Sequence, residues 1–196
     1  VQTITIRDNT VPTFTAPADK TIYTAADCTY DITVTNVGDV TNEADNCSTG
    51  LQATYVDAVP VAIAGCEGGY TIARTWSLVD NCGNAADNQV QTITIRDNTV
   101  PTFTAPANTT IYTDASCAYN ADPAITGDVE NEADNCSTGI EATYSDAVVD
   151  GTIQGTKVIT RTWSLVDNCG NSAASQTQII NVLDNTAPIL TNVPGN

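Results

Sequence analysis

Hydrophobic and polar residues alternate along most of this chain with the period of two that indicates half-buried β-strands. The strongest run covers residues 70–79. Its apolar face carries Tyr70, Ile72, Trp76 and Leu78, and Arg74 lies on the same face. Other runs predict strands at 1–6, 21–24, 30–37, 51–56 and 89–95, with one or two short strands in 58–64 and a long loop at 38–47. Helical periodicity is absent, so the pattern predicts about seven short strands in fewer than 90 residues.

One motif organises these strands into repeats. The residues that begin Arg7-Asp8-Asn9-Thr10-Val11-Pro12 return unchanged from Arg96, and an altered copy begins at Asp184. We interpret each copy as a joint between like modules. The pattern predicts the last strand of a preceding repeat at 1–7, full repeats at 8–96 and 97–183, and the start of a third repeat at 184–196.

Seven short strands with regular turn signals are typical of an antiparallel β-sandwich of the immunoglobulin type. We therefore predict an all-β chain of tandem immunoglobulin-like antiparallel β-sandwiches. Trp76 and its counterpart Trp163 are expected in the two cores, although an aromatic ligand platform is an alternative. Arg74 and Arg161 lie two residues before these tryptophans on the same strand face. At that spacing the arginine side chain can lie over the indole while its charged end reaches an acidic loop.

Composition narrows the possible partners. The 196 residues include 23 acidic and 6 basic residues and no histidine, which gives a net charge of −17. Such a charge repels nucleic acid and anionic membrane surfaces, so we expect neither as a partner. No apolar run reaches the length that spans a bilayer. The charge suits an extended surface protein or one that binds divalent cations.

The seven cysteines favour disulfides in an oxidising compartment over a metal site. The first repeat has Cys28, Cys47, Cys66 and Cys82, but the second has no counterpart of Cys66 and no histidine to replace it. A four-cysteine zinc site would therefore be incomplete in one copy.

A family resemblance comes from the combination Asp45-Asn46-Cys47-Ser48, Arg74-Thr75-Trp76 and Asp80-Asn81-Cys82-Gly83-Asn84, closed by the joint at Asp97. It resembles the HYR-like, immunoglobulin-like repeats of giant bacterial surface adhesins, most of all the SprB-type gliding motility adhesins of Bacteroidetes. The resemblance covers essentially the whole chain. It implies an extracellular, cell-surface location, export by the type IX route, and a stalk or adhesive role. The cysteine missing from the second repeat departs from a paired pattern.

Expected strand directions lead to a disulfide pairing. Cys47 and Cys82 follow strands that should end at the same end of the sandwich, whereas Cys28 and Cys66 should lie at the other end. A strand of about eight residues spans about 26 Å, which is too far for a bridge between the ends. We therefore predict the pairs Cys47–Cys82, Cys28–Cys66 and Cys136–Cys169, with Cys117 unpaired.

The acidic loops are the one feature that resembles a site. The joint and two loops should converge at one end of each repeat. In the first repeat they should bring Asp8, Asp45 and Asp80 close together, with Asp39 and Glu43 nearby. The second set comprises Asp97, Asp134 and Asp167. Clustered oxygen atoms suit Ca²⁺, and the joint resembles the calcium-binding end of the cadherin linker, although Arg7 replaces an acidic residue there. Solvated side chains that only shape turns explain the same residues, so both interpretations stay open.

We expect no enzyme activity, because the acid–base and triad arrangements that use histidine are absent and the carboxylates lie in polar loops. The sequence instead predicts a non-catalytic structural or adhesive repeat, which contacts neighbouring repeats and extends as a stalk or fibre, with lateral self-association as a further expectation. The alternative is a module whose loops bind a surface glycan or protein. Segments 56–69 and 145–156 differ between the repeats and are the candidate contact surface.

Overall fold

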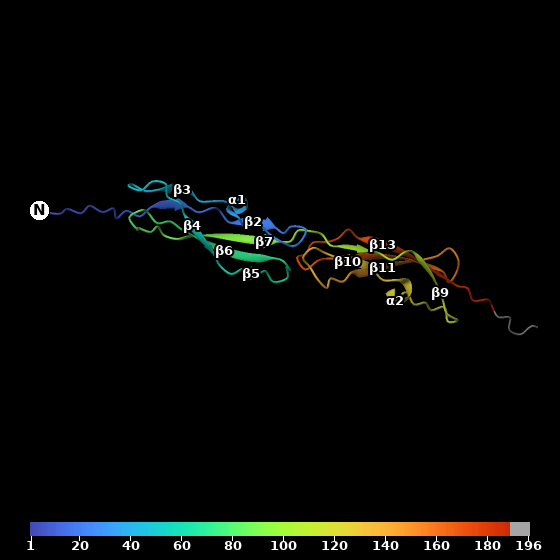
Figure 1. Ribbon diagram of the computed structural model, residues 1–196. Helices are drawn as coiled ribbons and strands as arrows, with labels where there is room; N and C mark the ends of the chain where they lie inside the picture. Colours follow the sequence, from blue (N-terminus) through green and yellow to red (C-terminus); the bar gives the residue numbers. More distant parts are fainter. Residues whose placement is uncertain (189–196) are drawn as a thin grey trace, which may run out of the picture. The chain divides into compact units, whose positions relative to one another are not determined.

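The structure is a computed structural model, and it describes residues 1–188. The chain forms two compact units: unit 1 contains Val1–Thr99 together with Asn135–Ser137, and unit 2 contains Val100–Asp134 and Thr138–Asn196. Both are built from short strands, which confirms the all-β sandwich class (Figure 1). Of the expected third repeat, residues 189–196 lie outside the described residues.

Unit 1 contains two sheets and one helical turn, α1 (Val34–Val37). The smaller sheet pairs β1 (Thr13–Thr15) with β3 (Thr41–Ala44). The larger sheet has the order β2-β7-β6-β4, and β5 also pairs with β6. Its strands are β2 (Lys20–Tyr23), β4 (Thr54–Asp57), β5 (Val61–Ala62), β6 (Tyr70–Ser77) and β7 (Gln89–Arg96).

Unit 2 repeats this plan with one continuous edge strand. β10 (Glu130–Ala133) pairs with β8 (Thr102–Thr104), and the larger sheet has the order β11-β12-β13-β9. Its strands are β9 (Thr109–Tyr112), β11 (Thr143–Asp150), β12 (Lys157–Ser164) and β13 (Gln176–Leu183), and α2 covers Pro123–Thr126. β11 takes the place of both β4 and β5.

The alternating pattern places the core on one face of the central strands. On β6, Ile72, Arg74 and Trp76 are each 1% exposed, while the intervening residues are half-buried or exposed. Opposite them, Ile72 pairs with Ile93 and Arg74 with Gln91. Burial of such apolar side chains contributes about 1.5–3 kcal/mol each. The strand run predicted at 70–79 is therefore confirmed, and both tryptophans are core residues.

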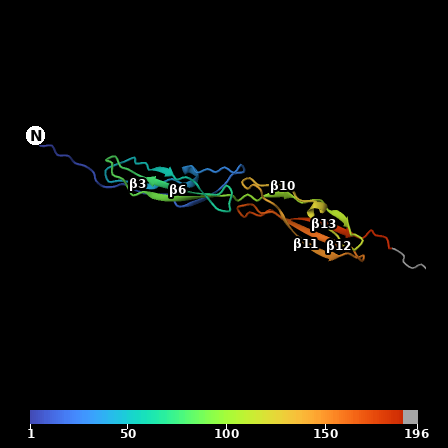
Figure 2. The ribbon, with the colours of Figure 1, turned by 90° about the horizontal axis from the view of Figure 1, so that it is seen from below.

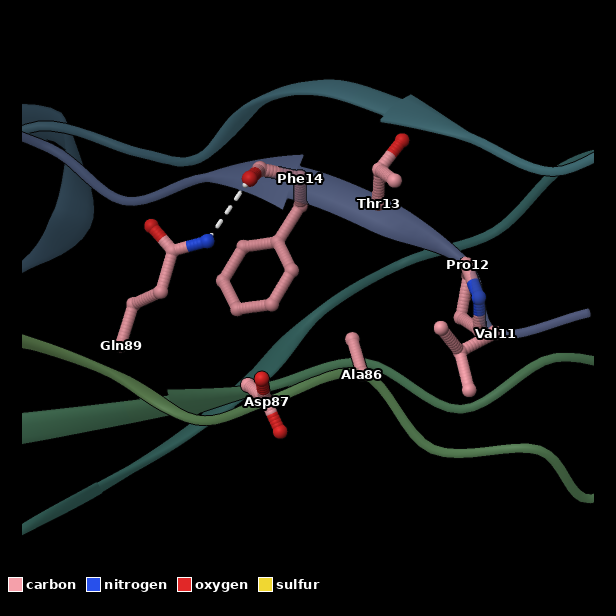
Figure 3. A pocket seen from close by; sticks show the side chains of 7 residues that line it. All are labelled: Val11, Pro12, Thr13, Phe14, Ala86, Asp87 and Gln89. Atoms are coloured by element: carbon pink, nitrogen blue, oxygen red, sulfur yellow. Dashed lines mark hydrogen bonds between the residues drawn. The ribbon is translucent and has the colours of Figure 1, made fainter.

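The short strand β1 is held by a side chain as well as by β3. Gln89 donates to the Phe14 carbonyl at 2.8 Å (Figure 3). It also accepts from the Ala16 amide at 2.9 Å, so the two bonds imitate a pair of ladder hydrogen bonds. Phe14 thereby stays in the cluster of Trp76 and Leu78. Alternation did not predict β1, because three residues are too few to show a period.

The larger sheets are not wholly antiparallel. β2 runs parallel to β7, and β9 runs parallel to β13, while the other pairs are antiparallel. The parallel pair places Ile22 opposite Ile95, where both are buried. The expectation of a fully antiparallel sandwich is corrected for this strand.

The strand predicted at 30–37 is wrong. Asp31 accepts a hydrogen bond from the Thr33 amide at 2.8 Å and starts a turn that leads into α1. Gly38 ends the helix with a φ of 104° and donates to the Val34 carbonyl, a conformation that glycine adopts without strain. The buried Val37 mimicked a strand position, and β3 forms within the expected loop instead.

The strand predicted at 1–6 is also absent. Ile4 and Ile6 are 76% and 91% exposed, and this segment extends away from the strands of unit 1 in both views (Figures 1 and 2). A strand needs a neighbour for its backbone hydrogen bonds, and none of the described strands pairs with this segment.

Candidate functional site

The arginine of the Arg74-Thr75-Trp76 pattern on β6 forms a buried ion pair. Arg74 donates from Nε and Nη2 to Asp57 at 2.7 and 2.8 Å, and from Nη2 to the Ile32 carbonyl at 2.8 Å. Its guanidinium lies 3.9 Å from the ring centre of Tyr55 and 5.9 Å from that of Trp76. The hydrogen bonds that Arg74 donates to Asp57 raise the pKa of Arg74. The acidic partner is therefore on β4 rather than in a loop, and Tyr55 is the closer ring.

The predicted convergence of acidic loops is observed in unit 1. Asp8, Asp45 and Asp80 each offer one carboxylate oxygen, and these atoms lie within 4.8 Å of one another. Asp8 and Asp45 are half-buried and Asp80 is buried. The other two expected members lie outside this group. Asp39 binds the Val40 amide, and Glu43 binds the Ala53 amide.

The loop after β6 holds Asp80 rigidly. Its Oδ1 accepts from the amides of Cys82 and Asn84 at 2.9 and 2.7 Å, and its Oδ2 accepts from the Asn84 side chain at 2.7 Å. The Asn84 side chain also donates to the Asp8 carbonyl at 3.3 Å, which connects the joint to this loop. Burial raises the pKa of Asp80, but the hydrogen bonds from Asn84 and Cys82 outweigh it and leave the pKa lowered.

The loop that contains Asp45 is arranged in a similar way. Asp45 Oδ2 accepts from the amides of Cys47 and Ser48 at 2.9 and 2.8 Å. These bonds lower the pKa of Asp45, against burial and the charge of Asp80, which raise it. The carboxylate therefore stays ionised beside its acidic neighbours.

Two carboxylate oxygens of this group lack partners. Asp8 Oδ2 and Asp45 Oδ1 are buried and accept no hydrogen bond from the residues that the structure describes. Burying an unpaired carboxylate oxygen is unfavourable unless a cation or donor satisfies it. Ca²⁺ binds oxygen ligands at about 2.3–2.6 Å, so ligands on opposite sides of the ion are about 4.6–5.2 Å apart. The spacing and chemistry of Asp8, Asp45 and Asp80 fit such an ion.

The second set of acidic residues repeats the local bonds. Asp167 accepts from the amides of Cys169 and Asn171, as Asp80 does from Cys82 and Asn84. Asp97 accepts from the Thr99 amide at 2.9 Å, as Asp8 does from Thr10 at 3.0 Å. Asp97 belongs to unit 1, whereas Asp134 and Asp167 belong to unit 2.

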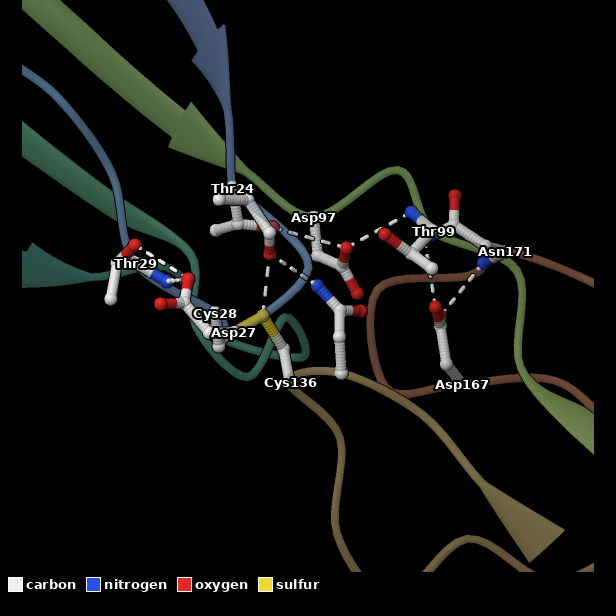
Figure 4. The surroundings of a disulfide bond; sticks show 11 residues. Thr24, Asp27, Cys28, Thr29, Asp97, Thr99, Cys136, Asp167 and Asn171 are labelled. Atoms are coloured by element: carbon white, nitrogen blue, oxygen red, sulfur yellow. Dashed lines mark hydrogen bonds between the residues drawn. A yellow bond between two sulfur atoms is a disulfide. The ribbon is translucent and has the colours of Figure 1, made fainter.

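The predicted disulfide pairing is wrong. Cys28 is bonded to Cys136, with a Cα–Cα distance of 5.0 Å, and the two are 108 residues apart (Figure 4). Cys66 and Cys169 are also disulfide-bonded. The free cysteines of the described chain are Cys47, Cys82 and Cys117, all exposed. Only the expectation of an unbonded Cys117 agrees with the structure.

The error came from confining each cysteine to its own sequence repeat. Cys136 belongs to the second repeat by sequence, but it lies in the segment Asn135–Ser137 that groups with unit 1. The loops of Cys47 and Cys82 do approach one another as expected. The pKa of Cys47 is raised first by the charge of Asp8, then by burial, Asp45 and Cys82. The unequal cysteine numbers of the two repeats were the signal that pairing within repeats could not be complete.

Shallow pockets accompany both short strands. One, of about 230 Å³, lies between β1 and the segment before β7 and is lined by Val11, Phe14 and Asp87 among others (Figure 3). Its counterpart, of about 250 Å³, is lined by Val100, Phe103 and Gln176 among others. Asp87 is the only ionisable residue in the two linings, so they offer no acid–base pair.

Comparison with known proteins gives a structural likeness only. No family model matches the chain, and no curated protein matches it. Among solved structures, the EC1–2 fragment of human protocadherin-24 in its crystal form II is similar with a TM-score of 0.34 and 11% identity, covering 90% of this chain and 100% of that chain. The likeness identifies neither a family nor a ligand.

No helix within residues 1–188 combines the length and the apolar character needed to cross a bilayer.

Proposed function

We propose that this chain is a non-catalytic structural and adhesive repeat in an extended extracellular stalk of a bacterial surface protein, of the HYR-like type. The observation that carries the proposal is the Cys28–Cys136 disulfide, which links residues of two different sequence repeats. Disulfides persist in oxidising, extracellular environments. A covalent link between repeats is useful to a protein that must keep its length under tension.

The disulfide determines how such tension is carried. A pull on the chain ends passes from Cys28 directly to Cys136, so the residues between them are not stretched. The 108-residue separation corresponds to roughly 360–390 Å of extended chain that the bond withholds. Most of the core of unit 1, including β6 and β7, lies within this protected segment.

Single-molecule force spectroscopy tests this role. The oxidised chain, pulled from its ends, should unfold with an extension shorter by at least roughly 360 Å than the chain treated with reductant. Cys117→Ser is the matched control, because it removes a free thiol and should leave the oxidised extension unchanged. Equal extensions with and without reductant would rule out the mechanical role.

We further propose that Ca²⁺ binds at Asp8, Asp45 and Asp80 and stiffens the joint that begins at Asp8. The unpartnered oxygens of Asp8 and Asp45 support this site. The ion would neutralise carboxylates that otherwise repel one another. Water would complete the six to eight ligands that Ca²⁺ takes.

Thermal unfolding in Ca²⁺ and in chelator tests this metal site. At a hundredfold excess over Kd, binding to the folded state adds about 2.7 kcal/mol, which raises Tm by several degrees. Asp45→Asn should reduce the rise, whereas Asp39→Asn, which removes an exposed carboxylate before β3 and outside the group, should not. Melting curves that overlay at ordinary ionic strength would show that the loops are only turns.

A ligand-binding module is the alternative function. The segments that differ between repeats carry exposed apolar side chains, with Val59 and Val61 at 84% and 67% exposure and Ile153 at 69%. Spacers need no such variation. Binding of the chain to glycan arrays or host-surface proteins, lost on Val59→Asp with Val61→Asp and retained on Val79→Asp, would favour this alternative over a spacer.

A further inference from the structure

The structure contains the Cys28–Cys136 disulfide and, on the same chain, the two unbonded cysteines of an equivalent pair. Cys28 and Cys117 occupy the same position of the first and second sequence repeats, 89 residues apart (28 and 117). Cys47 and Cys136 are equivalent in the same way (47 and 136). Cys28 is bonded to Cys136, while Cys47 and Cys117 are exposed free thiols. One chain therefore presents both members of a second pair.

The turn that presents Cys117 matches the turn that presents Cys28. The two cysteines have φ angles of 62° and 61°, which are uncommon for residues other than glycine. Each donates its amide to the residue three positions earlier, Cys28 to Ala25 at 2.9 Å and Cys117 to Asp114 at 3.0 Å. Cys117 is thus held in the backbone conformation that its bonded counterpart has.

A buried hydroxyl beside Cys117 is also unpartnered. Thr24 Oγ1 lies 3.6 Å from Cys136 Sγ and donates to Asp97 Oδ1 at 3.2 Å (Figure 4). Its equivalent, Thr113, is 7% exposed, and its Oγ1 has no hydrogen-bond partner among the described residues. The loop of an incoming cysteine would place a sulfur atom beside Thr113 Oγ1, as Cys136 Sγ lies beside Thr24 Oγ1.

The loop that presents Cys47 is equally prepared. Asp45 binds the Cys47 amide, and Ser48 Oγ accepts from the Asn81 amide at 3.2 Å, so the loop has a fixed shape. In the bonded case, the residue before Cys136, Asn135, donates to the Ala25 carbonyl at 2.9 Å. Asn46 precedes Cys47 and can make the same bond to the carbonyl of Asp114, the equivalent of Ala25.

We propose that Cys117 of one copy of the chain forms a disulfide with Cys47 of a second copy, so that copies join end to end. The contact is heterologous, because each copy uses one surface as donor and a different one as acceptor, and such a contact propagates into a filament. The proposal holds whether or not the chain serves as a stalk. Its outcome depends on Cys47 and Cys117, not on Cys28.

The bond requires an oxidant, which we take to be a small-molecule disulfide such as oxidised glutathione. The Cys117 thiolate attacks this disulfide, forms a mixed disulfide and releases one glutathione thiolate. The Cys47 thiolate then attacks the Cys117 sulfur and displaces the second glutathione. Two protein thiols are oxidised, one glutathione disulfide is reduced, and the two protons leave with the glutathione thiols.

Oxidation of the 196-residue chain with oxidised glutathione at high protein concentration tests the proposal. Non-reducing electrophoresis should show a ladder of oligomers, and peptide mapping should recover the Cys47–Cys117 pair at least tenfold above any other pairing of Cys117. Cys47→Ser alone and Cys117→Ser alone should stop the ladder. An equimolar mixture of the two variants should form dimers and nothing longer, because each contributes one half.

Cys82→Ser is the matched control, since Cys82 is another exposed free cysteine near Cys47 and should leave the ladder intact. All three cysteines are exposed, and circular dichroism verifies that each serine variant keeps its strands. Closure of Cys47 onto Cys82 within one chain would overturn the proposal. Predominant Cys117–Cys117 dimers, or a chain that stays monomeric, would overturn it as well.

Discussion

The buried arginines of the two repeats differ by one hydrogen bond. Arg161 donates from Nη1 to Thr126 Oγ1 at 2.9 Å, in addition to its bonds to Asp146 and the Ala121 carbonyl. Arg74 makes the equivalent bonds to Asp57 and Ile32, but its Nη1 has no acceptor among the described residues. The position of Thr126 is occupied by Val37 in the first repeat.

This comparison separates what the fold requires from what it tolerates. Both repeats keep a carboxylate on the neighbouring strand, at 26% side-chain exposure, against an arginine at 1%. Both also stack the guanidinium on a tyrosine, at 3.9 and 4.1 Å. The Nη1 donor of the arginine has an acceptor in the second repeat but none among the described residues in the first. The charge pair is therefore the shared requirement, and the hydroxyl is an addition that the second repeat has and the first lacks.

Removing the carboxylate should have the largest effect. Asp57→Ala leaves the Arg74 charge buried without its counter-ion, and breaking a buried pair in this way costs about 3–5 kcal/mol. We expect the lower end, because Asp57 is 26% exposed. Asp146→Ala should cost less, since Thr126 still accepts from Arg161. Urea unfolding followed by hydrogen exchange of β6 and β12 peptides measures each repeat separately.

Asp87→Ala provides the control for this pair of variants. Because Asp87 is exposed, its removal should leave the free energy of unfolding of both repeats unchanged. Equal losses in the two repeats would show that the threonine hydroxyl contributes nothing to the buried arginine.

Exchanging the hydroxyl between repeats should have a smaller effect of opposite sign. Thr126→Val removes an acceptor from Arg161 and should destabilise the second repeat by about 1.5–3 kcal/mol, the range for hydrogen bonds to charged groups. Val37→Thr offers Arg74 Nη1 an acceptor and should stabilise the first repeat by about 1 kcal/mol. The same exchange measurement applies. A destabilising Val37→Thr would mean that the hydroxyl cannot reach Arg74 Nη1.

The sequence predicted the long central strands, because eight alternating residues on β6 and β7 show a clear period. It also predicted the convergence of Asp8, Asp45 and Asp80, because strand directions determine which loops share an end. These features depend on local pattern and simple topology.

Interactions between distant residues contribute to most of the failures. The bond from Gln91 to the Val37 carbonyl at 2.9 Å, together with the local turn at Asp31, favours a helical turn over the strand that Ile32 and Val34 suggest. The Cys28–Cys136 bond joins positions 108 residues apart, which no pattern within one repeat can show. The hydroxyl at Thr126 matters only because β12 brings Arg161 to it.

The smallest expected effect concerns the turn before α1, where the repeats differ in charge. Asp31 accepts from the Thr33 amide, and this bond lowers the pKa of Asp31. Asn120 makes the equivalent bond to the Asp122 amide at 2.9 Å with an amide oxygen that does not titrate. A carboxylate whose folded pKa is lowered stabilises the fold above its unfolded pKa, and this contribution is lost as pH falls through the folded value.

Acid should therefore loosen the turn at Asp31 while the native Asn120 bond persists. Asp31→Asn should remove the acid-dependent loss of protection in peptides that cover α1, and Asn120→Asp should introduce such a loss at α2. Hydrogen exchange between pH 2 and 6, corrected for intrinsic rates, measures both variants. Because Asp31 is exposed, we expect a change confined to this turn and too small to shift global unfolding. An α1 pH profile that is the same in Asp31→Asn and the unmodified chain would show that the acid sensitivity arises elsewhere, for example at Asp27, whose pKa is lowered by hydrogen bonds from Thr29.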